Sequence, residues 1–247
     1  MAADPIIYFG IIGLAIFLTG LSKGGLGGTL GALITPIVAL VMPIDQAIGL
    51  LLPIFIVGDA FALAAHWRRW NARLIWLLLP GGLVGITLGT FMLTSISPAG
   101  LKRALAVIIF IFICYRLMEP RILKRLHYRS EKWHGWLAGG VAGFASTLAH
   151  AGGPPVVIYL MMQNLTPAIF AATSVLFFAV TNWIKVPYYY QAGLLELGQL
   201  LPIIWLAPLV PLGVWMGRRW ADRVNPIVFD RIIVFFLAIT GIFLLAS

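Results

Sequence analysis

The chain has 247 residues, of which 61% are hydrophobic and only 10% are charged. A soluble domain carries roughly 25% charged residues, so this composition excludes a water-soluble fold and indicates a protein that crosses a membrane several times. The net charge of +9 would suit a nucleic-acid partner. The basic residues lie between the apolar runs, however, where they indicate membrane topology instead, and no nucleic-acid partner is expected.

The apolar runs predict helices. Only helices and closed barrels satisfy every backbone group in lipid, and the uniform runs lack the alternation of barrel strands. We therefore expect an all-α polytopic membrane protein. The expected segments of the first half are 6–21, 29–42, 46–66, 74–95 and 99–118, and those of the second half are 135–149, 154–165, 168–189, 197–217 and 227–246. The first two segments of each half are short for the ~20 residues of a span, which favours a hairpin of half-helices at the centre.

An internal repeat relates the two halves. Four residues of the first half recur 128 positions later: Pro80, Gly89, Pro98 and Arg103 correspond to Pro208, Gly217, Pro226 and Arg231. Asp59 falls near Asn182, at a spacing of 123. We expect a first membrane repeat over 1–118, a basic cytoplasmic connector over 119–132 and a second membrane repeat over 133–247.

The basic residues predict how the two repeats are oriented. Five segments in each half make the second repeat inverted and place most Lys and Arg side chains on the cytoplasmic side. Lys102 and Arg103 then remain outside, and both termini face outward. Four crossings in each half would move more positive charge outside, so the rule favours two inverted-topology repeats. Full spans and re-entrant hairpins give the same count, and both possibilities stay open.

Two breaks lie inside the apolar runs, at 23–28 and at 152–155. Each interrupts a helix with glycines and exposes N–H groups at a helix start, which behaves like roughly half a positive charge and attracts anions. Paired breaks are typical of a transporter with its site between two repeats, although glycines also serve close helix packing. The residues expected to bind the substrate are Lys23, Gly24, Gly25, Gly27, Gly28, His150, Gly152, Gly153, Asn182 and Lys185.

Several ionisable residues lie in apolar segments, where such residues usually mark a pathway or an ion pair. Lys23 and Lys185 would attract an anion, or would instead reach toward an interface. His150 would donate to an anion or cap the carbonyls of its break. Asp59 is a candidate for ion pairing with a lysine or for carrying a coupled proton.

Two other classes of function remain as alternatives. An intramembrane enzyme would need a nucleophile beside a base, and the best pair is Ser146 with His150, which are four residues apart. A permease for cations or other small solutes would need several intramembrane carboxylates. The single cysteine, Cys114, has no metal-type spacing, so neither a metal nor a cofactor is expected. The sequence does not define an oligomeric state.

Four stretches together resemble the TauE/SafE sulfite exporter family, also called the toluene sulfonate uptake permease family: 20–28 with Pro36, 57–59, 146–155 and 176–182. The resemblance covers nearly the whole chain, and 146–155 is its most specific part. It implies a secondary transporter in the bacterial inner membrane that moves a small sulfur-containing anion, such as sulfite, sulfoacetate or another organosulfonate, with export as the usual direction. Lys185 and His150 belong to the pattern of the subgroup that this chain resembles.

Overall fold

The computed structural model describes residues 4–26, 28–125, 131–220 and 226–246. All regular elements in these ranges are helical, which confirms the all-α prediction. The first half contains α1 (Pro5–Leu21), a π-helical turn η1 (Ser22–Leu26), α2 (Gly28–Val38), α3 (Ile44–Ala65), α4 (Ala72–Ser95) and α5 (Pro98–Arg125). The second half contains α6 (Lys132–Ala149), α7 (Gly153–Met161), α8 (Pro167–Gln191), a 3-10 helix η2 (Leu197–Leu206), α9 (Leu209–Trp220) and α10 (Pro226–Ala246).

Several of these helices are long and apolar enough to cross a membrane. Within the described ranges, four qualify singly: α1 with its π-helical turn, α3, α4 and α8. The pair η2 and α9 qualifies as a fifth, bent by 51°. By contrast, α2 and α7 have 11 and 9 residues, or about 16 and 14 Å of helix against a ~30 Å hydrocarbon core. The chain is therefore a multi-pass membrane protein in which a half-length helix follows each break.

Several boundaries differ from the sequence prediction: α2 and α7 end four residues earlier than expected, at Val38 and Met161, and two further differences change the architecture. The prediction of one continuous segment over 197–217 is wrong, because this stretch divides into η2 and α9. Pro202 and Pro208 lie in this stretch, and each removes a backbone donor and disfavours a continuous α-helix. In addition, α5 continues to Arg125, so the expected connector at 119–132 is helical in its first part, while 126–130 lie outside the described residues. The division into repeats stays a prediction.

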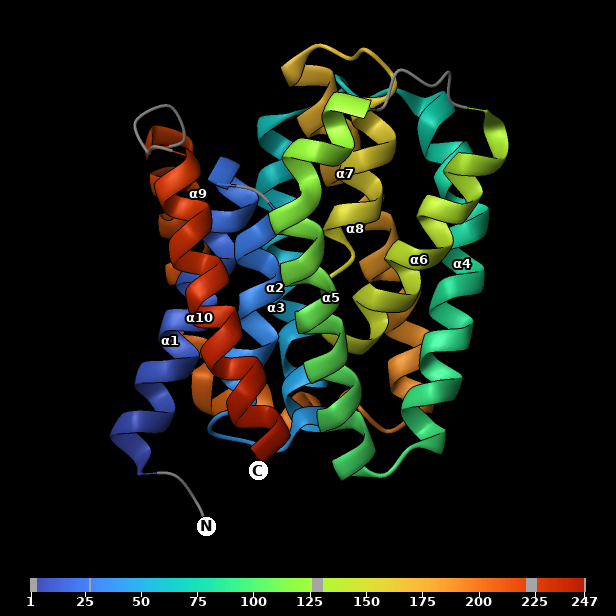
Figure 1. The fold of residues 1–247 in the computed structure, drawn as a ribbon. Coiled ribbons are helices and arrows are strands. Elements are labelled where there is room, and N and C mark those ends of the chain that lie inside the picture. Colours follow the sequence, from blue (N-terminus) through green and yellow to red (C-terminus); the bar gives the residue numbers. More distant parts are fainter. Residues whose placement is uncertain (1–3, 27, 126–130, 221–225, 247) are drawn as a thin grey trace.

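Two groups of helices each have an apolar core of their own, and a third core joins residues of both groups to α5 and α10 (Figure 1). The first group joins α1, α2, α3, η2 and α9 around residues such as Ile16, Leu51 and Val210. The second group joins α4, α6, α7 and α8 around residues such as Leu78 and Phe177. Each group therefore mixes the sequence halves, because α9 packs on α1 and α4 packs on α6.

Glycine residues let α9 cross α1, and α4 cross α6, at close distance. A Cβ atom on Gly85 of α4 would lie 2.0 Å from the carbonyl oxygen of Gly140 on α6. Likewise, a Cβ atom on Gly20 of α1 would lie 2.3 Å from the carbonyl oxygen of Val210 on α9. Close backbone approach through small residues is the usual way in which helices associate in a membrane, and here it joins the two halves of the chain.

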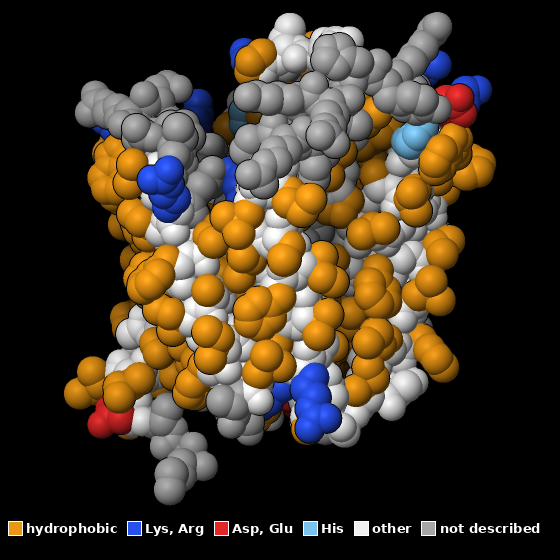
Figure 2. Space-filling model, in the orientation of Figure 1, with side chains coloured by type: hydrophobic (Ala, Val, Ile, Leu, Met, Phe, Trp, Pro, Cys, Tyr) orange, Lys and Arg blue, Asp and Glu red, His pale blue; other side chains and the backbone are white. Residues whose placement is uncertain are grey.

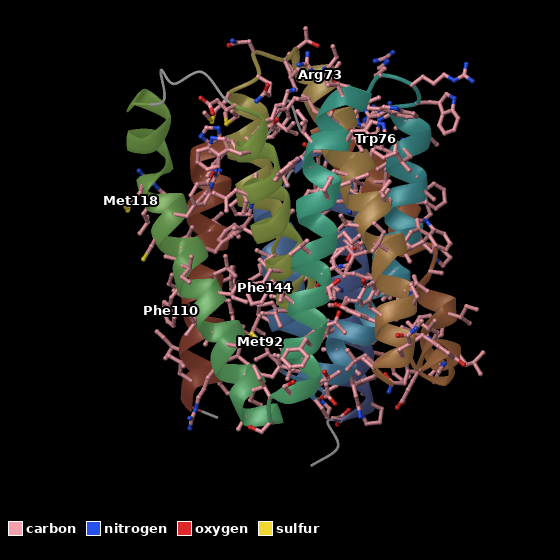
Figure 3. All side chains as sticks on the ribbon, turned by 90° about the vertical axis from the view of Figure 1, so that its right-hand side faces the viewer. Arg73, Trp76, Met92, Phe110, Met118 and Phe144 are labelled. Atoms are coloured by element: carbon pink, nitrogen blue, oxygen red, sulfur yellow. The ribbon has the colours of Figure 1, made fainter. Side chains whose placement is uncertain are left out.

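The remaining helices α5 and α10 pack against each other along the outside of both groups. In Figure 3, Phe110 is on α5, whereas Met92 and Phe144 belong to α4 and α6 and pack against the apolar core that α5 helps to form. The start of α1 and the end of α10 lie at one end of the molecule, and the ends of α3 and α5 lie at the other with the starts of α4 and α6 (Figure 1). In Figure 2 the side between these ends is covered by hydrophobic side chains, and Lys and Arg gather toward the ends, as a lipid-facing surface requires.

Candidate functional site

The two breaks line one cavity of about 310 Å³. On one side, Gly25 has φ 136° and so needs glycine's conformational freedom. On the other side, α6 ends at His150 in the left-handed conformation, with φ 53°, and α7 begins at Gly153 with prolines in its first turn. Lys23, Gly25, His150 and Gly153 all face this space. The tertiary structure thus brings together the two breaks, which lie in different halves of the sequence.

Lys23 forms an ion pair with Asp59 of α3, although the two residues are 36 positions apart. The other carboxylate oxygen of Asp59 accepts a hydrogen bond of 2.6 Å from the side-chain amide of Asn182 on α8. Asp59 and Asn182 are 1% and 4% exposed, so the carboxylate bridges the two helix groups inside the protein. Of the two interpretations of Asp59, ion pairing is the one that the structure contains.

Two phenyl rings complete the surroundings of Lys23. Its ammonium nitrogen lies 5.5 Å from the ring centroid of Phe55 and 5.6 Å from that of Phe178, within reach of a cation–π interaction. Phe55 and Phe178 are 123 residues apart, the same spacing that separates Asp59 from Asn182. Equivalent residues of α3 and α8 therefore face one another across a single lysine.

Lys185 lies fully buried on α8 behind the cavity wall. Its ammonium nitrogen is 3.1 Å from the hydroxyl of Ser146 and 5.9 Å from the centroid of the Tyr189 ring. Among the described residues no carboxylate lies within ion-pair distance of it. Since Lys185 does not reach an interface, the structure favours an intramembrane role for this lysine over snorkelling.

His150 presents an unused nitrogen. Its Nδ1 lies 3.0 Å from the carbonyl oxygen of Ser146, while its Nε2 is buried and has no hydrogen-bond partner among the described residues. The ring is held edge-to-face by Phe55, with centroids 4.7 Å apart. A buried polar atom without a partner is costly, so its place in the cavity wall is a reason to expect a polar ligand.

The same contacts remove the best catalytic pairing of the sequence. His150 contacts the backbone carbonyl of Ser146, whereas the Ser146 hydroxyl accepts from Lys185. A serine nucleophile would need its hydroxyl on the imidazole, and that arrangement is missing from the described structure. Nor do the described residues group three His, Cys, Asp or Glu side chains that could hold a metal ion.

The glycines of the breaks divide into two kinds. Gly25 and Gly153 line the cavity. At Gly24, a Cβ atom would lie 2.4 Å from the carbonyl oxygen of Val214, and at Gly152 it would lie 2.5 Å from that of Ala142, so helix packing accounts for these two. Gly28 begins α2, and the predicted site residue Gly27 lies outside the described residues.

A family model matches this chain. The family model described as sulfite exporter TauE/SafE matches residues 12–244, nearly the whole chain. The chain belongs to the TauE/SafE family. No curated protein and no solved structure matches it. Membership in a family of transporters confirms the expectation of a carrier rather than an enzyme, and the match includes both breaks and every predicted site residue.

Sequence reasoning missed several residues of this TauE/SafE chain that line the cavity. Phe55 and Phe178 carry a signal that would have found them, namely the 123-residue spacing shared with Asp59 and Asn182. His66 and Ser174 also line the cavity. Nothing in the sequence marks Ser174, because a single serine in an apolar helix usually bonds to its own backbone, and the sequence indicates His66 only as part of an interfacial aromatic and basic cluster.

Proposed function

We propose that this chain moves a small sulfur-containing anion, such as sulfite, sulfoacetate or another organosulfonate, out of the bacterial cytoplasm through the cavity between the two breaks. The observation that carries the proposal is the cavity between the two breaks, which is lined by the cationic Lys23 and by Asn182, with the fully buried Lys185 behind its wall. A sulfur oxyanion offers several acceptor oxygens, and Asn182 and Lys23 would supply donors. Because Nδ1 of His150 donates to the Ser146 carbonyl, Nε2 would donate as well only when the ring carries a second proton.

The ion pair modifies the electropositive pocket that the sequence indicates. Asp59 already balances Lys23, so an arriving anion competes with a carboxylate for that ammonium group. We infer that substrate binding loosens the contact of Asp59 with Lys23 and Asn182, which joins the two helix groups. A ligand that binds one arrangement more tightly shifts the population toward it, so this competition links occupancy to movement.

Alternating access would then be a movement of the two helix groups about the central pocket. The tight α4–α6 and α1–α9 crossings lie inside the groups, whereas the cavity is lined by α3 and α8 from different groups. The moving bodies would therefore be the two helix groups and not the two sequence halves. We place both termini on the periplasmic side of the inner membrane, because the basic helix ends lie opposite the termini.

The test is flux of labelled sulfite, sulfoacetate and sulfate in proteoliposomes. Lys23→Gln is expected to reduce flux at least tenfold, while Lys102→Gln, near the start of α5 and outside the cavity lining, serves as the control lysine. Wild-type protein that moves none of these anions, or undiminished flux in Lys23→Gln, would contradict the proposal. A reporter fused after Ser247 that is active only in the cytoplasm would contradict the orientation.

A further inference from the structure

The cavity extends well beyond the central residues, toward the basic end of the molecule. Helices α3 and α8 run in opposite directions, and the hydrogen bond of Asn182 to Asp59 fixes their register. His66 comes seven residues after Asp59, and Ser174 comes eight residues before Asn182. At 1.5 Å of rise per residue, both lie roughly 10–12 Å from the central pair. They therefore occupy one level, and both line the cavity.

The Ser174 hydroxyl makes no hydrogen bond within the described structure. Its Oγ atom is buried and has no hydrogen-bond partner among the described residues. Other hydroxyls of α8 behave differently: Thr173 donates to the carbonyl of Ile169 at 2.7 Å, and Thr181 donates to that of Phe178 at 3.1 Å. A buried hydroxyl normally finds a partner, so the exception at Ser174 indicates a ligand that enters the cavity.

Two arginines bring positive potential to the level of His66. Burial and the charges of Arg218 and Arg69 lower its pKa from 6.5, so the ring is mostly neutral at pH 7 and donates one N–H. Both arginines are close enough to act on the imidazole, and their field attracts anions to the mouth of the cavity. The neighbouring lining residues Phe170, Ala171 and Val175 offer no side-chain donor, so polar contact at this level falls to His66 and Ser174.

We propose that His66 and Ser174 form a second anion subsite, an entry station that holds one small oxyanion before it reaches Lys23, Asn182 and His150. The distance between the two levels is much longer than a one-sulfur oxyanion, so a single ion cannot contact both. The subsite rests on the proposed function for its role in transport, but its existence as an anion site can be measured without flux.

The experiment uses a reporter cysteine at the subsite. Because Cys114 is exposed, the background is Cys114→Ser, and Ser174→Cys is added. The rate of modification from the basic side is measured with a sulfonate-bearing and an ammonium-bearing methanethiosulfonate reagent. We expect the sulfonate reagent to react about fivefold faster, the preference to disappear with Arg218→Gln, and methanesulfonate to slow the reaction. The deciding measurement repeats the protection in Lys23→Gln, where the central site is impaired.

Protection that persists in Lys23→Gln supports a separate subsite, and protection that disappears there shows that only central binding shields Ser174, which overturns the proposal. A second arm measures entry kinetics. Ser174→Ala should raise KM about tenfold, the factor for one hydrogen bond to an anion, with kcat little changed; Ser174→Thr should restore KM, and Thr181→Ala is the matched control. Unchanged KM in Ser174→Ala also overturns it. Protection without any flux in the wild type would refute the transport function and leave the subsite standing.

Discussion

Asp59 joins Lys23 to Asn182, and in doing so connects a helix break of the first half to a helix of the second. The pair is enclosed, with side-chain exposures of 13% for Lys23 and 2% for Asp59. An enclosed pair is weak evidence of stabilisation as such, since desolvation offsets much of the attraction. Breaking it by removing one partner is nevertheless costly, because the other charge is left buried.

We predict that Asp59→Ala destabilises the protein by about 3 kcal/mol, because Lys23 is left without its carboxylate. Reversible unfolding in mixed micelles measures the free energy. The double variant Lys23→Ala with Asp59→Ala should recover at least ~1 kcal/mol of the summed single losses, since the two residues act as a pair. Strictly additive losses would show that the ion pair contributes nothing to the folded state.

The stability of the folded protein should depend on pH through His66, which lies at the mouth of the cavity. Its pKa is lowered by burial first and then by Arg218 and Arg69, so the unfolded chain takes up a proton at this residue before the folded protein does. Stability contributed by the neutral ring is therefore lost as pH falls below about 6.5 and on through the folded-state pKa. Arg218→Gln should raise the His66 pKa and weaken this loss. NMR titration of labelled histidine measures the pKa of His66 in both proteins. An unchanged His66 pKa in Arg218→Gln would mean that the charge of Arg218 does not act on this ring.

Helix packing provides a prediction with an internal control. Gly85→Ala places a Cβ atom 2.0 Å from the carbonyl oxygen of Gly140, and overpacking of this kind costs about 1–3 kcal/mol or more. Gly10→Ala has no atom within 4 Å of the new methyl group and should be neutral or slightly stabilising, since alanine favours helix over glycine. Thermal unfolding in detergent compares the two, and equal losses would argue against the close α4–α6 crossing.

Cross-linking tests which helices move together. In the Cys114→Ser background, a reducible bifunctional thiol reagent that joins His66→Cys to Ser174→Cys should stop flux, because it links α3 to α8 across the cavity. Both residues belong to the proposed subsite, so the same variant before linking gives the reference flux. Thr87→Cys with Tyr188→Cys joins α4 to α8, whose side chains are hydrogen-bonded at 2.9 Å within one group, and should leave most flux. Proteoliposome transport before and after reduction gives both answers. Inhibition by the second link alone would mean that the groups are divided elsewhere.

The amino-acid sequence by itself determined the fold class and the position of nearly every helix. Long apolar runs in lipid permit little besides helices, because each segment must satisfy its own backbone. The sequence also predicted the breaks at 23–28 and 152–155, since glycine and proline change the backbone locally. The same local rule applies at Pro202 and Pro208, where the sequence contained the break of η2 from α9 although the apolar run suggested one helix.

Only the tertiary structure decided which partners those residues have. No local pattern shows that Asp59 pairs with Lys23 or that Lys185 donates to Ser146. Nor does any local pattern show that His150 Nε2 and Ser174 Oγ have no partner among the described residues. Such contacts depend on the register between helices far apart in the chain, and that register is set by backbone approach at glycines such as Gly85 and Gly20. The packing of α4 with helices of the second half, and of α9 with helices of the first half, depends on the same close backbone approach. Such packing between distant segments leaves no periodic pattern in the sequence of either segment.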